Sequence, residues 1–572
     1  MGGGVHRGRT ADEGGRQTVT DYDVVVVGSG FGGSVAALRL TEKGYRVAVL
    51  EAGRRFADHE FARTSWDVRR FLWAPRLGCY GIQRIHRLPH VTVLAGAGVG
   101  GGSLVYANTL YQPDDAFYDD PQWAGITDWR TELAPYFVLA SRMLGVVRNP
   151  TVTPSDEAMR EVAEQMGAGG TFTLTPVGVF FGPAPGVTVE DPFFDGAGPA
   201  RTGCVECGAC MTGCRHGAKN TLPKNYLWLA ERAGADVLPL TTVTAVRPDA
   251  GGGYAVDTVR TGAWTAHRTR RTVTASQVVL AAGTYGTQRL LHRMRDDGHL
   301  RHLSPRLGEL TRTNSESLVG ARSRRRDVDF SRGVAITSSF RPAPHTHVEP
   351  VRYGRGSNLM GLLGTALTDG GGPRPRWVTW LREQVRHPVR TVRTLSLRHW
   401  SERTVIGLVM QSLDNSLVVS GHRGRLGRWR LTTRHGHGAP SPTWVPEGNE
   451  AVRRLARVID GEPGGTYADL LGSPLTAHFL GGAVIGPDPE RGVVDGWHRV
   501  FGHPGLHVVD GAAVSANLGA NPSLTITAQA ERAMAFWPNA DEPDPRPPLG
   551  APYHPVAPVP AYRPVVRGRT PQ

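Results

Sequence analysis

The apolar positions first gather in the run DYDVVVVGSGFGGSVAALRL, which begins at Asp21. Its consecutive valines are typical of a buried strand, and the spacing that follows, up to Lys43, is typical of a helix. A second apolar run, YRVAVLEAG, predicts another strand. A strand, a helix and a strand within about thirty residues form the repeating unit of a doubly wound parallel sheet.

Two later segments combine a strand pattern with glycines in the same way. They are QVVLAAGTYGTQRLL, near 277–291, and LHVVDGAAVSANLGANPSLTITAQAERAMA, near 506–535. We expect both to return to the first sheet, so that one domain is assembled from distant parts of the chain. The predicted domain comprises residues 21–115, 204–320 and 484–538.

The remaining residues predict a second lobe and two tails. Alternating or β-rich runs within 311–420 predict a mixed or antiparallel sheet. The fold class is therefore α/β, with a Rossmann-like domain and a second domain, 116–203 plus 321–483, built on a mostly antiparallel sheet plus helices. Residues 1–20 are polar and predict a disordered N-terminal tail, and 539–572 predict a proline-rich tail that is extended or disordered.

Composition narrows the class of protein. A chain of 572 residues is too long for one core. The net charge is +14, and nearly all of the positive charge is carried by arginine. This excess indicates either a solvated basic surface or a surface that binds an anionic partner. No nucleic-acid-binding motif accompanies the charge, so we expect no nucleic-acid partner. We find no apolar run long enough to span a membrane and no signal peptide, and the clustered cysteines favour a reducing, cytoplasmic compartment.

A dinucleotide site is predicted at the first strand–helix junction. Gly28, Gly30 and Gly33 form the pattern G-x-G-x-x-G after a strand and at the head of a helix. The first glycine permits the tight turn, the second lets the backbone approach a pyrophosphate, and the third lets helix and strand pack closely. Glu51 ends the second strand, where it can accept hydrogen bonds from ribose hydroxyls.

Taken together, these motifs resemble a known family. GSGFGG, LEAG, GAGVGGGSLVYANTL, AAGTYGTQRLL, LGELTRTNSE, HFLGG and VVDGAAVSANLGANPSLTITAQAER occur in the order seen in the glucose–methanol–choline (GMC) oxidoreductases. Within that family the chain is similar to the branch of non-covalent FAD cholesterol oxidases, from about Asp21 to Pro538. The resemblance implies an FAD cofactor, and it adds the following to the predicted cofactor-binding residues: Gly100, Ser103, Asn108, Val243, Gly283, Asp510 and Asn521.

The resemblance also implies the catalytic residues. The family's histidine and asparagine correspond to His478 of HFLGG and Asn521 of ANPSLTI. From the residues alone, a structural loop histidine is the favoured interpretation of His478, because the chain has 21 histidines. Glu349 in HTHVEPVRYG corresponds to the carboxylate that moves the ring double bond in cholesterol oxidases. Two alternatives stay open: Glu349 is a surface carboxylate without this role, or His345 or His347 takes the role instead.

The activity implied by the resemblance is FAD-dependent oxidation of a sterol 3β-hydroxyl. Hydride passes to the flavin, and reoxidation by O2 gives H2O2, with Δ5→Δ4 isomerisation as an additional step. The alternative is an FAD alcohol dehydrogenase that acts on another hydrophobic alcohol and passes electrons through a cysteine-bound iron–sulphur cluster to an acceptor other than oxygen.

Four of the five cysteines lie in one short segment. Cys204, Cys207, Cys210 and Cys214 have the spacing C-x2-C-x2-C-x3-C, which resembles a ferredoxin run except that arginine follows the fourth cysteine. In ferredoxins with two clusters that fourth cysteine serves the other cluster, so here either Cys214 or Cys79 completes a four-iron site or a three-iron site forms. A structural thiol loop, an iron–sulphur cluster, zinc and disulphides all stay open, and no metal is assigned.

A basic segment offers a possible membrane contact. In RWVTWLREQVRHPVRTVRTLSLRHW, residues 376–400, apolar side chains recur at helical spacing from Trp377 and arginines take the other faces. Such a helix can lie on an anionic bilayer, which an enzyme acting on a sterol would use. A core-facing amphipathic helix is the alternative.

Overall fold

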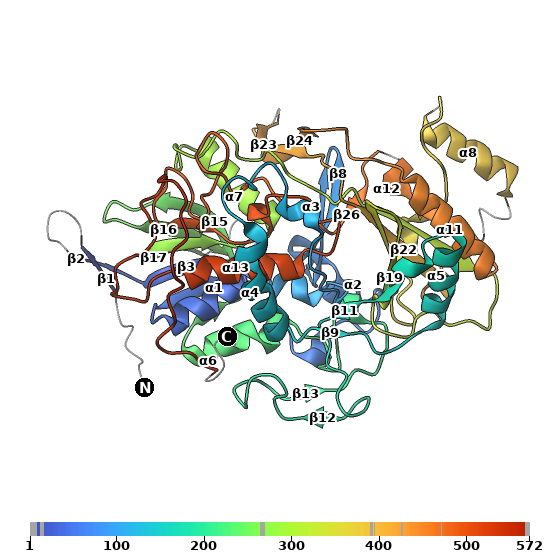
Figure 1. Cartoon of the computed structure of the whole chain (residues 1–572), viewed down its shortest axis with the longest axis horizontal. Coiled ribbons are helices and arrows are strands. Elements are labelled where there is room, and N and C mark those ends of the chain that lie inside the picture. Colours follow the sequence, from blue (N-terminus) through green and yellow to red (C-terminus); the bar gives the residue numbers. More distant parts are fainter. Residues whose placement is uncertain are drawn as a thin grey trace.

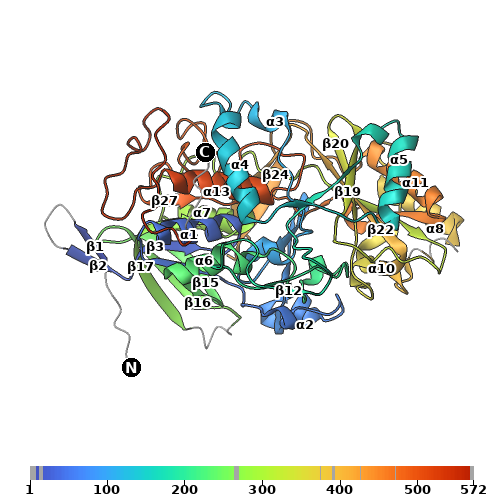
Figure 2. The ribbon, with the colours of Figure 1, turned by 60° about the horizontal axis from the view of Figure 1, so that its bottom comes forward.

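The described residues form two lobes, each built around a seven-stranded sheet (Figures 1 and 2). The computed structural model describes residues 8–11, 17–262, 269–373, 375–388, 393, 395–424, 427–470 and 472–566. Among these residues, no helix combines the length and the apolarity needed to cross a bilayer.

The first sheet is the predicted doubly wound sheet. Its strands run in the order β14-β4-β3-β17-β16-β15, and β27 also pairs with β17. The pairs β14·β4, β4·β3, β3·β17 and β17·β27 are parallel, whereas β16 and β15 extend the sheet antiparallel. Both later segments therefore return to this sheet, as predicted. The strands are β3 (Tyr22–Val27), β4 (Val47–Leu50), β14 (Asp236–Leu238), β15 (Thr241–Pro248), β16 (Tyr254–Arg260), β17 (Arg270–Leu280) and β27 (Leu506–Val508).

Helix α1 (Phe31–Glu42) is enclosed by its neighbours. It packs against α6 (Tyr226–Ala233) and α13 (Ser523–Ala535), and α13 packs in turn against α4 (Trp129–Met143). Every residue of α1 except Arg39 is buried, because the sheet covers one side and the two helices cover the others. Arg39 donates to both carboxylate oxygens of Glu531 at 2.8 Å, which ties α1 to α13. The glycine-rich turn before α1 is thus held on a rigid frame.

The second sheet has the order β10-β19-β20-β22-β18-β25-β21, and every neighbouring pair is antiparallel. Helices α5 (Pro154–Gln165) and α11 (Pro446–Val458) pack together on it (Figure 1). The predicted antiparallel lobe is therefore confirmed. Its strands are β10 (Thr173–Leu174), β18 (Ser317–Ser323), β19 (Ser338–Ala343), β20 (Thr346–Val351), β21 (Gly364–Ala366), β22 (Thr404–Gln411) and β25 (Gly461–Thr466).

Smaller elements complete the two lobes. The strands among them are β5 (Trp73–Ala74), β6 (Cys79–Tyr80), β7 (Gln83–Leu88), β8 (Val91–Gly96), β9 (Val147–Arg148), β11 (Pro176–Val177), β12 (Thr188–Val189), β13 (Arg201–Thr202), β23 (Leu417–Arg423), β24 (Trp429–His435) and β26 (Leu475–Thr476). The helices among them are α2 (Val68–Phe71), α3 (Asp115–Tyr118), α7 (Thr284–Asp296), α8 (Arg376–Arg386), α10 (Trp400–Arg403) and α12 (Tyr467–Leu470).

The two predicted tails differ from each other. In the N-terminal region, expected to be disordered, β1 (Gly8–Ala11) and β2 (Gln17–Thr20) pair antiparallel, while 1–7 and 12–16 lie outside the described residues. The proline-rich tail is extended up to residue 566 and packs on the first lobe, where the Tyr553 hydroxyl donates to Glu132 of α4. The domain boundaries given by the sequence remain a proposal.

Helix α8 projects from the second lobe (Figure 1). None of its residues is buried, and Trp377, Leu381 and Val385 are 55, 48 and 74% exposed. The alternative of a core-facing amphipathic helix is therefore wrong for these three side chains. Residues 389–392, onto which the predicted pattern continues, lie outside the described residues. Contact with a bilayer stays a prediction, which sedimentation with anionic vesicles tests.

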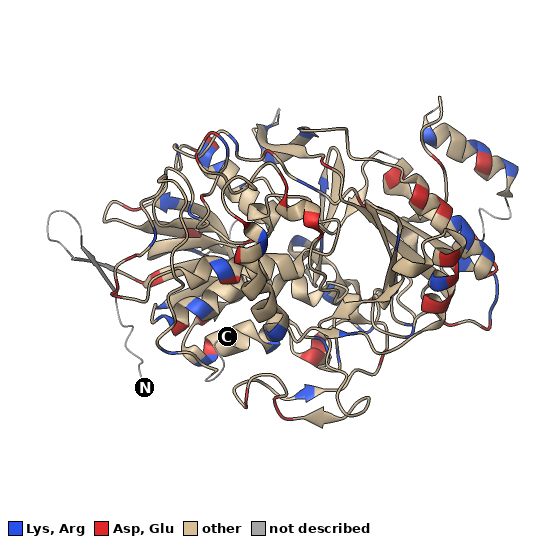
Figure 3. Ribbon diagram, viewed as in Figure 1, with Lys and Arg blue, Asp and Glu red and all other residues tan. Residues whose placement is uncertain are grey.

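Charged residues are interspersed over both lobes (Figure 3). On α11, for example, Glu450 accepts from Arg454 at 2.7 Å and lies 3.8 Å from Arg457. Glu450 and Arg454 lie one helical turn apart, and such a pair stabilises the helix surface. This pattern favours the solvated-surface interpretation of the net charge.

Candidate active site

A cavity of about 770 Å³ extends between the lobes. One end is formed by the glycine-rich turn after β3 and by the residues that follow β4. The other end reaches strands of the second sheet and is lined mainly by apolar side chains. These include Val105, Met211, Leu318, Ile336, Val351, Tyr353, Met360, Ile406, Leu408 and Leu475.

The three glycines of the fingerprint differ in what surrounds them. A Cβ added at Gly28, where φ is +103°, would lie 2.3 Å from the Ala281 carbonyl oxygen, and one at Gly33 would lie 2.1 Å from the Gly28 oxygen. Both positions therefore exclude any side chain for reasons of packing. A Cβ at Gly30 meets no atom of the described residues within 4 Å, and Gly30 faces the cavity at the N-terminus of α1. The free space beside Gly30 fits a pyrophosphate held by the helix N-terminus.

Glu51 links the first glycine-rich turn to the second one. Its Oε2 accepts from the Ser29 amide at 3.1 Å and from Ser29 Oγ at 2.7 Å, and its Oε1 accepts from the Gly53 amide at 2.7 Å. The Gly100 amide donates to Ser29 Oγ at 3.0 Å. Glu51 still borders the cavity, where its remaining lone pairs can accept from ribose hydroxyls.

The predicted cofactor-binding residues divide into two groups. Those that border the cavity are Gly28, Gly30, Glu51, Val243, Gly283, Asp510 and Asn521. Gly33, Gly100, Ser103 and Asn108 are not on its wall. Ser103 Oγ instead donates to the Gly100 oxygen at 2.7 Å and accepts from the Leu222 amide at 3.0 Å, so it holds the second glycine-rich turn in shape.

Asp510 is a buried carboxylate at the cavity wall. It accepts from Thr287 Oγ1 at 2.5 Å and from the Ala512 amide at 2.9 Å. Burial raises the pKa of Asp510 to about 6, and the hydrogen bond from Thr287 opposes that rise. The residue fastens β27 to α7 beside the cavity.

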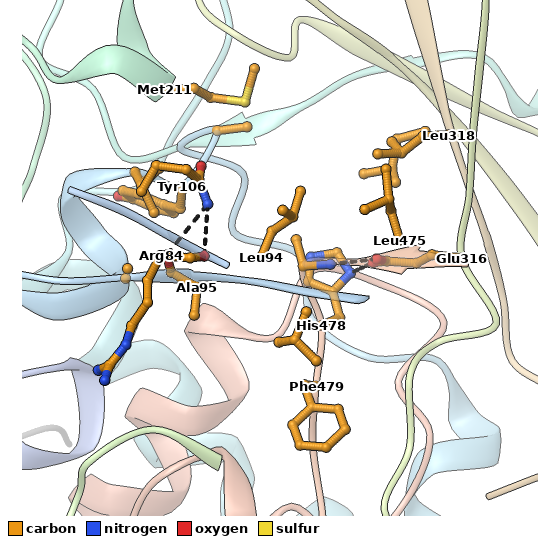
Figure 4. A pocket seen from close by; sticks show the side chains of 18 of the residues that line it. Arg84, Leu94, Ala95, Tyr106, Met211, Glu316, Leu318, Leu475, His478 and Phe479 are labelled. Carbon is orange, nitrogen blue, oxygen red and sulfur yellow. Dashed lines mark hydrogen bonds and ion pairs between the residues drawn. The ribbon is translucent and has the colours of Figure 1, made fainter. Parts of the chain in front are cut away.

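His478 and Glu316 face each other at the centre of the site (Figure 4). His478 Nδ1 contacts Glu316 Oε1, and both side chains are buried. The second oxygen of Glu316 accepts from the Ala477 amide at 2.7 Å, so the carboxylate is held by the segment that carries the histidine. A carboxylate at Nδ1 keeps the imidazole proton on that nitrogen and leaves Nε2 as an acceptor.

Asn314 connects this pair to the segment of Asn521. Its Nδ2 donates to the Ala520 oxygen at 2.8 Å and lies 3.3 Å from His478 Nδ1. Asn314 and Ser315 have φ values of +52° and +46°, which side-chain-bearing residues rarely adopt. This backbone turns just before β18 and directs Glu316 into the cavity.

Glu349 lies on β20 behind Asn521 and does not border the cavity itself. Asn521 Nδ2 donates to Glu349 Oε2 at 3.4 Å, and within the described residues Glu349 Oε1 has no hydrogen-bond partner. Burial raises the pKa of Glu349 to about 8; the Asn521 hydrogen bond lowers the pKa and the charge of Glu316 adds to the rise. Glu349 is fully buried, so it is not a surface carboxylate.

The two other histidines have different surroundings. His347 is buried, with Nε2 3.9 Å from Glu349 Oε1, and burial lowers its pKa to about 4, which keeps the ring neutral. His345 is exposed. Of the two, His347 alone lies close enough to Glu349 to influence it.

Glu316 and Asn314 were not assigned a role from the sequence. Both lie in LGELTRTNSE, which is one of the motifs that resemble the GMC family. The available signal was a run of polar residues, TRTNSES, directly before an apolar strand. Such a run at a strand end places polar side chains at the edge of a sheet, where sites form.

The four clustered cysteines surround a second, much smaller cavity. Cys204, Cys207, Cys210 and Cys214 all line it, and Cys79 lies elsewhere on β6. All five are free thiols.

Comparisons with known proteins agree with this geometry. Residues 23–66 match the sequence model described as an FAD binding domain, and residues 200–294 and 466–530 match two described as GMC oxidoreductase. The chain is 63% identical to a cholesterol oxidase of Mycobacterium tuberculosis (strain ATCC 25618 / H37Rv), over 96% of this chain and 97% of that protein. It is 43% identical to a cholesterol oxidase of Acinetobacter baumannii, over 91% and 94%.

A solved structure of another protein has a similar fold. Formate oxidase superposes with a TM-score of 0.56 at 14% identity, over 90% of this chain and 97% of that one. Together with the glycine-rich turn beside an open cavity, these comparisons show an FAD-dependent oxidoreductase. The chain belongs to the GMC oxidoreductase family.

Proposed function

We propose that the protein oxidises the 3β-hydroxyl of a cholesterol-like sterol. The observation that carries the proposal is the identity of 63% with a cholesterol oxidase along almost the whole of both chains. The cavity supports it, because a dinucleotide end joins an apolar chamber that suits a rigid hydrocarbon. Gly28, Gly30 and Glu51 would hold FAD at that end, and the bound flavin would supply the acceptor for the carbinol hydride and the route of its electrons to O2, giving H2O2.

His478 is proposed to take the hydroxyl proton. With Nδ1 held by Glu316, its Nε2 is the acceptor. Asn521 is proposed to orient the alcohol: one N–H of its Nδ2 is directed to Glu349, and the other can donate to the oxygen of the hydroxyl whose proton His478 takes. The two side chains would thereby fix the direction of the carbinol C–H bond.

The test compares two epimers. Oxygen uptake and peroxide formation are measured with cholesterol and with its 3α epimer, which has the same rings and tail. We expect turnover with the 3β epimer and at least tenfold less with the 3α epimer, because a misdirected C–H bond loses the aligned geometry. Failure of cholesterol to support any uptake would argue against a sterol substrate.

Glu349 is further proposed to move the ring double bond after oxidation. A carboxyl group with a pKa of about 8 is a strong enough base to remove a proton next to a carbonyl once it is ionised. Its contact with Asn521 supports this role, since the Asn521 side chain that donates to the carboxylate borders the cavity.

We therefore expect Glu349→Gln to keep sterol oxidation within a few-fold while slowing isomerisation by about 100-fold or more. In the unaltered protein, isomerisation should rise as the pH approaches about 8, because the ionised form is the active one. The measurement follows peroxide for oxidation and the conjugated ketone for isomerisation. His345→Gln, at the exposed position, is the control; an E349Q variant that still forms the conjugated ketone at the normal rate refutes the assignment.

A further inference from the structure

The four cysteines of one loop line one cavity outside the proposed active site. Cys204, Cys207, Cys210 and Cys214 share its wall with small or apolar residues, including Val179, Val205, Ala209, Ala218 and Gly333. In ferredoxins with two clusters, the fourth cysteine of this spacing serves a different cluster. Here Cys214 faces the same cavity as the other three, so one loop provides a complete set of four cysteine sulphurs.

The loop is shaped to surround that cavity. Glu206 has a φ of +52°, and Gly208 and Gly213 have values of +67° and +103°. A Cβ at Gly208 would lie 2.1 Å from the Ser331 carbonyl oxygen, so the loop is pressed tightly against the second lobe. The Glu206 amide already lies 3.4 Å from Cys204 Sγ, as a donor to that sulphur. Amide donors of this kind stabilise thiolates.

Two cations are buried beside the thiols without a carboxylate partner. Lys219 and Arg201 are each 1% exposed, and among the described residues neither forms an ion pair with a carboxylate. Lys219 Nζ donates to the Cys210 carbonyl at 2.9 Å and lies within electrostatic range of the Cys210 and Cys214 thiols. Arg201 has Cys214 as its strongest favourable charge neighbour, and its Nε and Nη2 have no hydrogen-bond partner in the described part of the chain.

Buried cations are costly unless negative charge lies nearby. Disulphides and protonated thiols are neutral, so Lys219 would have only carbonyl oxygens as partners, and Arg201 would keep only Asp58 and Asp191, whose effect on it is smaller than that of Cys214. Four thiolates bound to metal carry a net negative charge that balances them. A single zinc ion does not suit the described residues, in which no three His, Cys, Asp or Glu side chains are grouped to hold one metal ion. Thiolates spread around a cavity instead suit a cluster with several irons, each bound by one of them.

We propose that Cys204, Cys207, Cys210 and Cys214 bind an iron–sulphur cluster, with Lys219 and Arg201 balancing its charge. The site adjoins the proposed active site: Cys210 lines the small cavity, and the next residue, Met211, lines the large one (Figure 4). Lys219 Nζ also donates to the Tyr106 carbonyl at 2.8 Å, and the Tyr106 side chain borders the large cavity.

The test is metal analysis of the full-length protein, purified without oxygen and then incubated with ferrous iron and sulphide. We expect iron and acid-labile sulphide in near-equal amounts, about two to four of each per chain, with an electron paramagnetic resonance signal after reduction. Bound zinc in place of iron, or no retained iron after this incubation, overturns the proposal. This measurement uses the unaltered protein, so its result does not depend on whether a variant folds.

Variants then assign the ligands. Cys207→Ser and Cys210→Ser are expected to lose most of the iron and sulphide, and Cys79→Ser, outside the loop, to keep both. Equal iron in all three variants overturns the assignment. These experiments measure metal content and not turnover. The cluster proposal and the proposed sterol oxidation can therefore be refuted independently of each other.

Discussion

Replacing His478 with asparagine should lower kcat for sterol oxidation by about 10²- to 10⁴-fold, because the hydroxyl proton then has no acceptor. The KM should change much less, since the apolar chamber that binds the hydrocarbon is untouched. The FAD content should equal that of the unaltered protein, because the imidazole does not support the glycine-rich turn. The measurement is steady-state peroxide formation, normalised to bound flavin.

Glu316 provides the companion variant. Glu316→Gln should lower kcat by about 10- to 1000-fold, because an amide no longer fixes the imidazole proton on Nδ1. Glu316→Asp, which keeps the charge, should recover part of the loss, and the pH dependence of kcat should shift in the Gln variant and not in the Asp variant. Full activity of H478N, or identical pH profiles in both Glu316 variants, would exclude the proposed pair from the reaction.

Replacing Gly30 with alanine should release FAD from a protein that still folds. The added Cβ meets no protein atom within 4 Å, and the backbone at Gly30, with a φ of −72°, is one that alanine adopts. The stability of the apoprotein should therefore be unchanged or slightly higher. The methyl group would occupy space needed by the pyrophosphate, and such overpacking costs about 1–3 kcal/mol, or about 5- to 150-fold in Kd.

Gly33→Ala is the matched control for that prediction. Its Cβ would lie 2.1 Å from the Gly28 oxygen, so α1 must move from the sheet and the apoprotein itself should melt at a lower temperature. Flavin binding is followed by fluorescence and apoprotein stability by thermal unfolding. Normal FAD affinity in G30A would mean that the pyrophosphate does not lie beside Gly30.

Much of the fold was predictable because its signals are local. The valine run, the glycine fingerprint and Glu51 lie within one strand–helix–strand unit, whose hydrophobic period identifies it without knowledge of distant contacts. The antiparallel lobe was predictable for the same reason, since alternating runs within 311–420 became β18, β20 and β22.

The arrangement within the site was less predictable because it depends on contacts between distant segments. Nothing near Glu316 indicates that His478 will be its partner, and an asparagine followed by a serine does not by itself specify the left-handed backbone that Asn314 and Ser315 adopt. Ser103 shares a motif with cavity residues, yet its side chain is turned inward to hold the loop. A motif identifies a segment, whereas packing decides which of its side chains reach the cavity.

The most direct test of the account is the visible spectrum of the purified protein under anaerobic conditions, before and after cholesterol is added. Without oxygen, electrons taken from the sterol stay on the protein, so the bands of oxidised flavin should disappear at about one equivalent of cholesterol. The 3α epimer should leave the bands in place over the same time. If the bands persist with cholesterol in a protein that holds its full complement of FAD, a sterol is not the reductant and the proposed function is wrong.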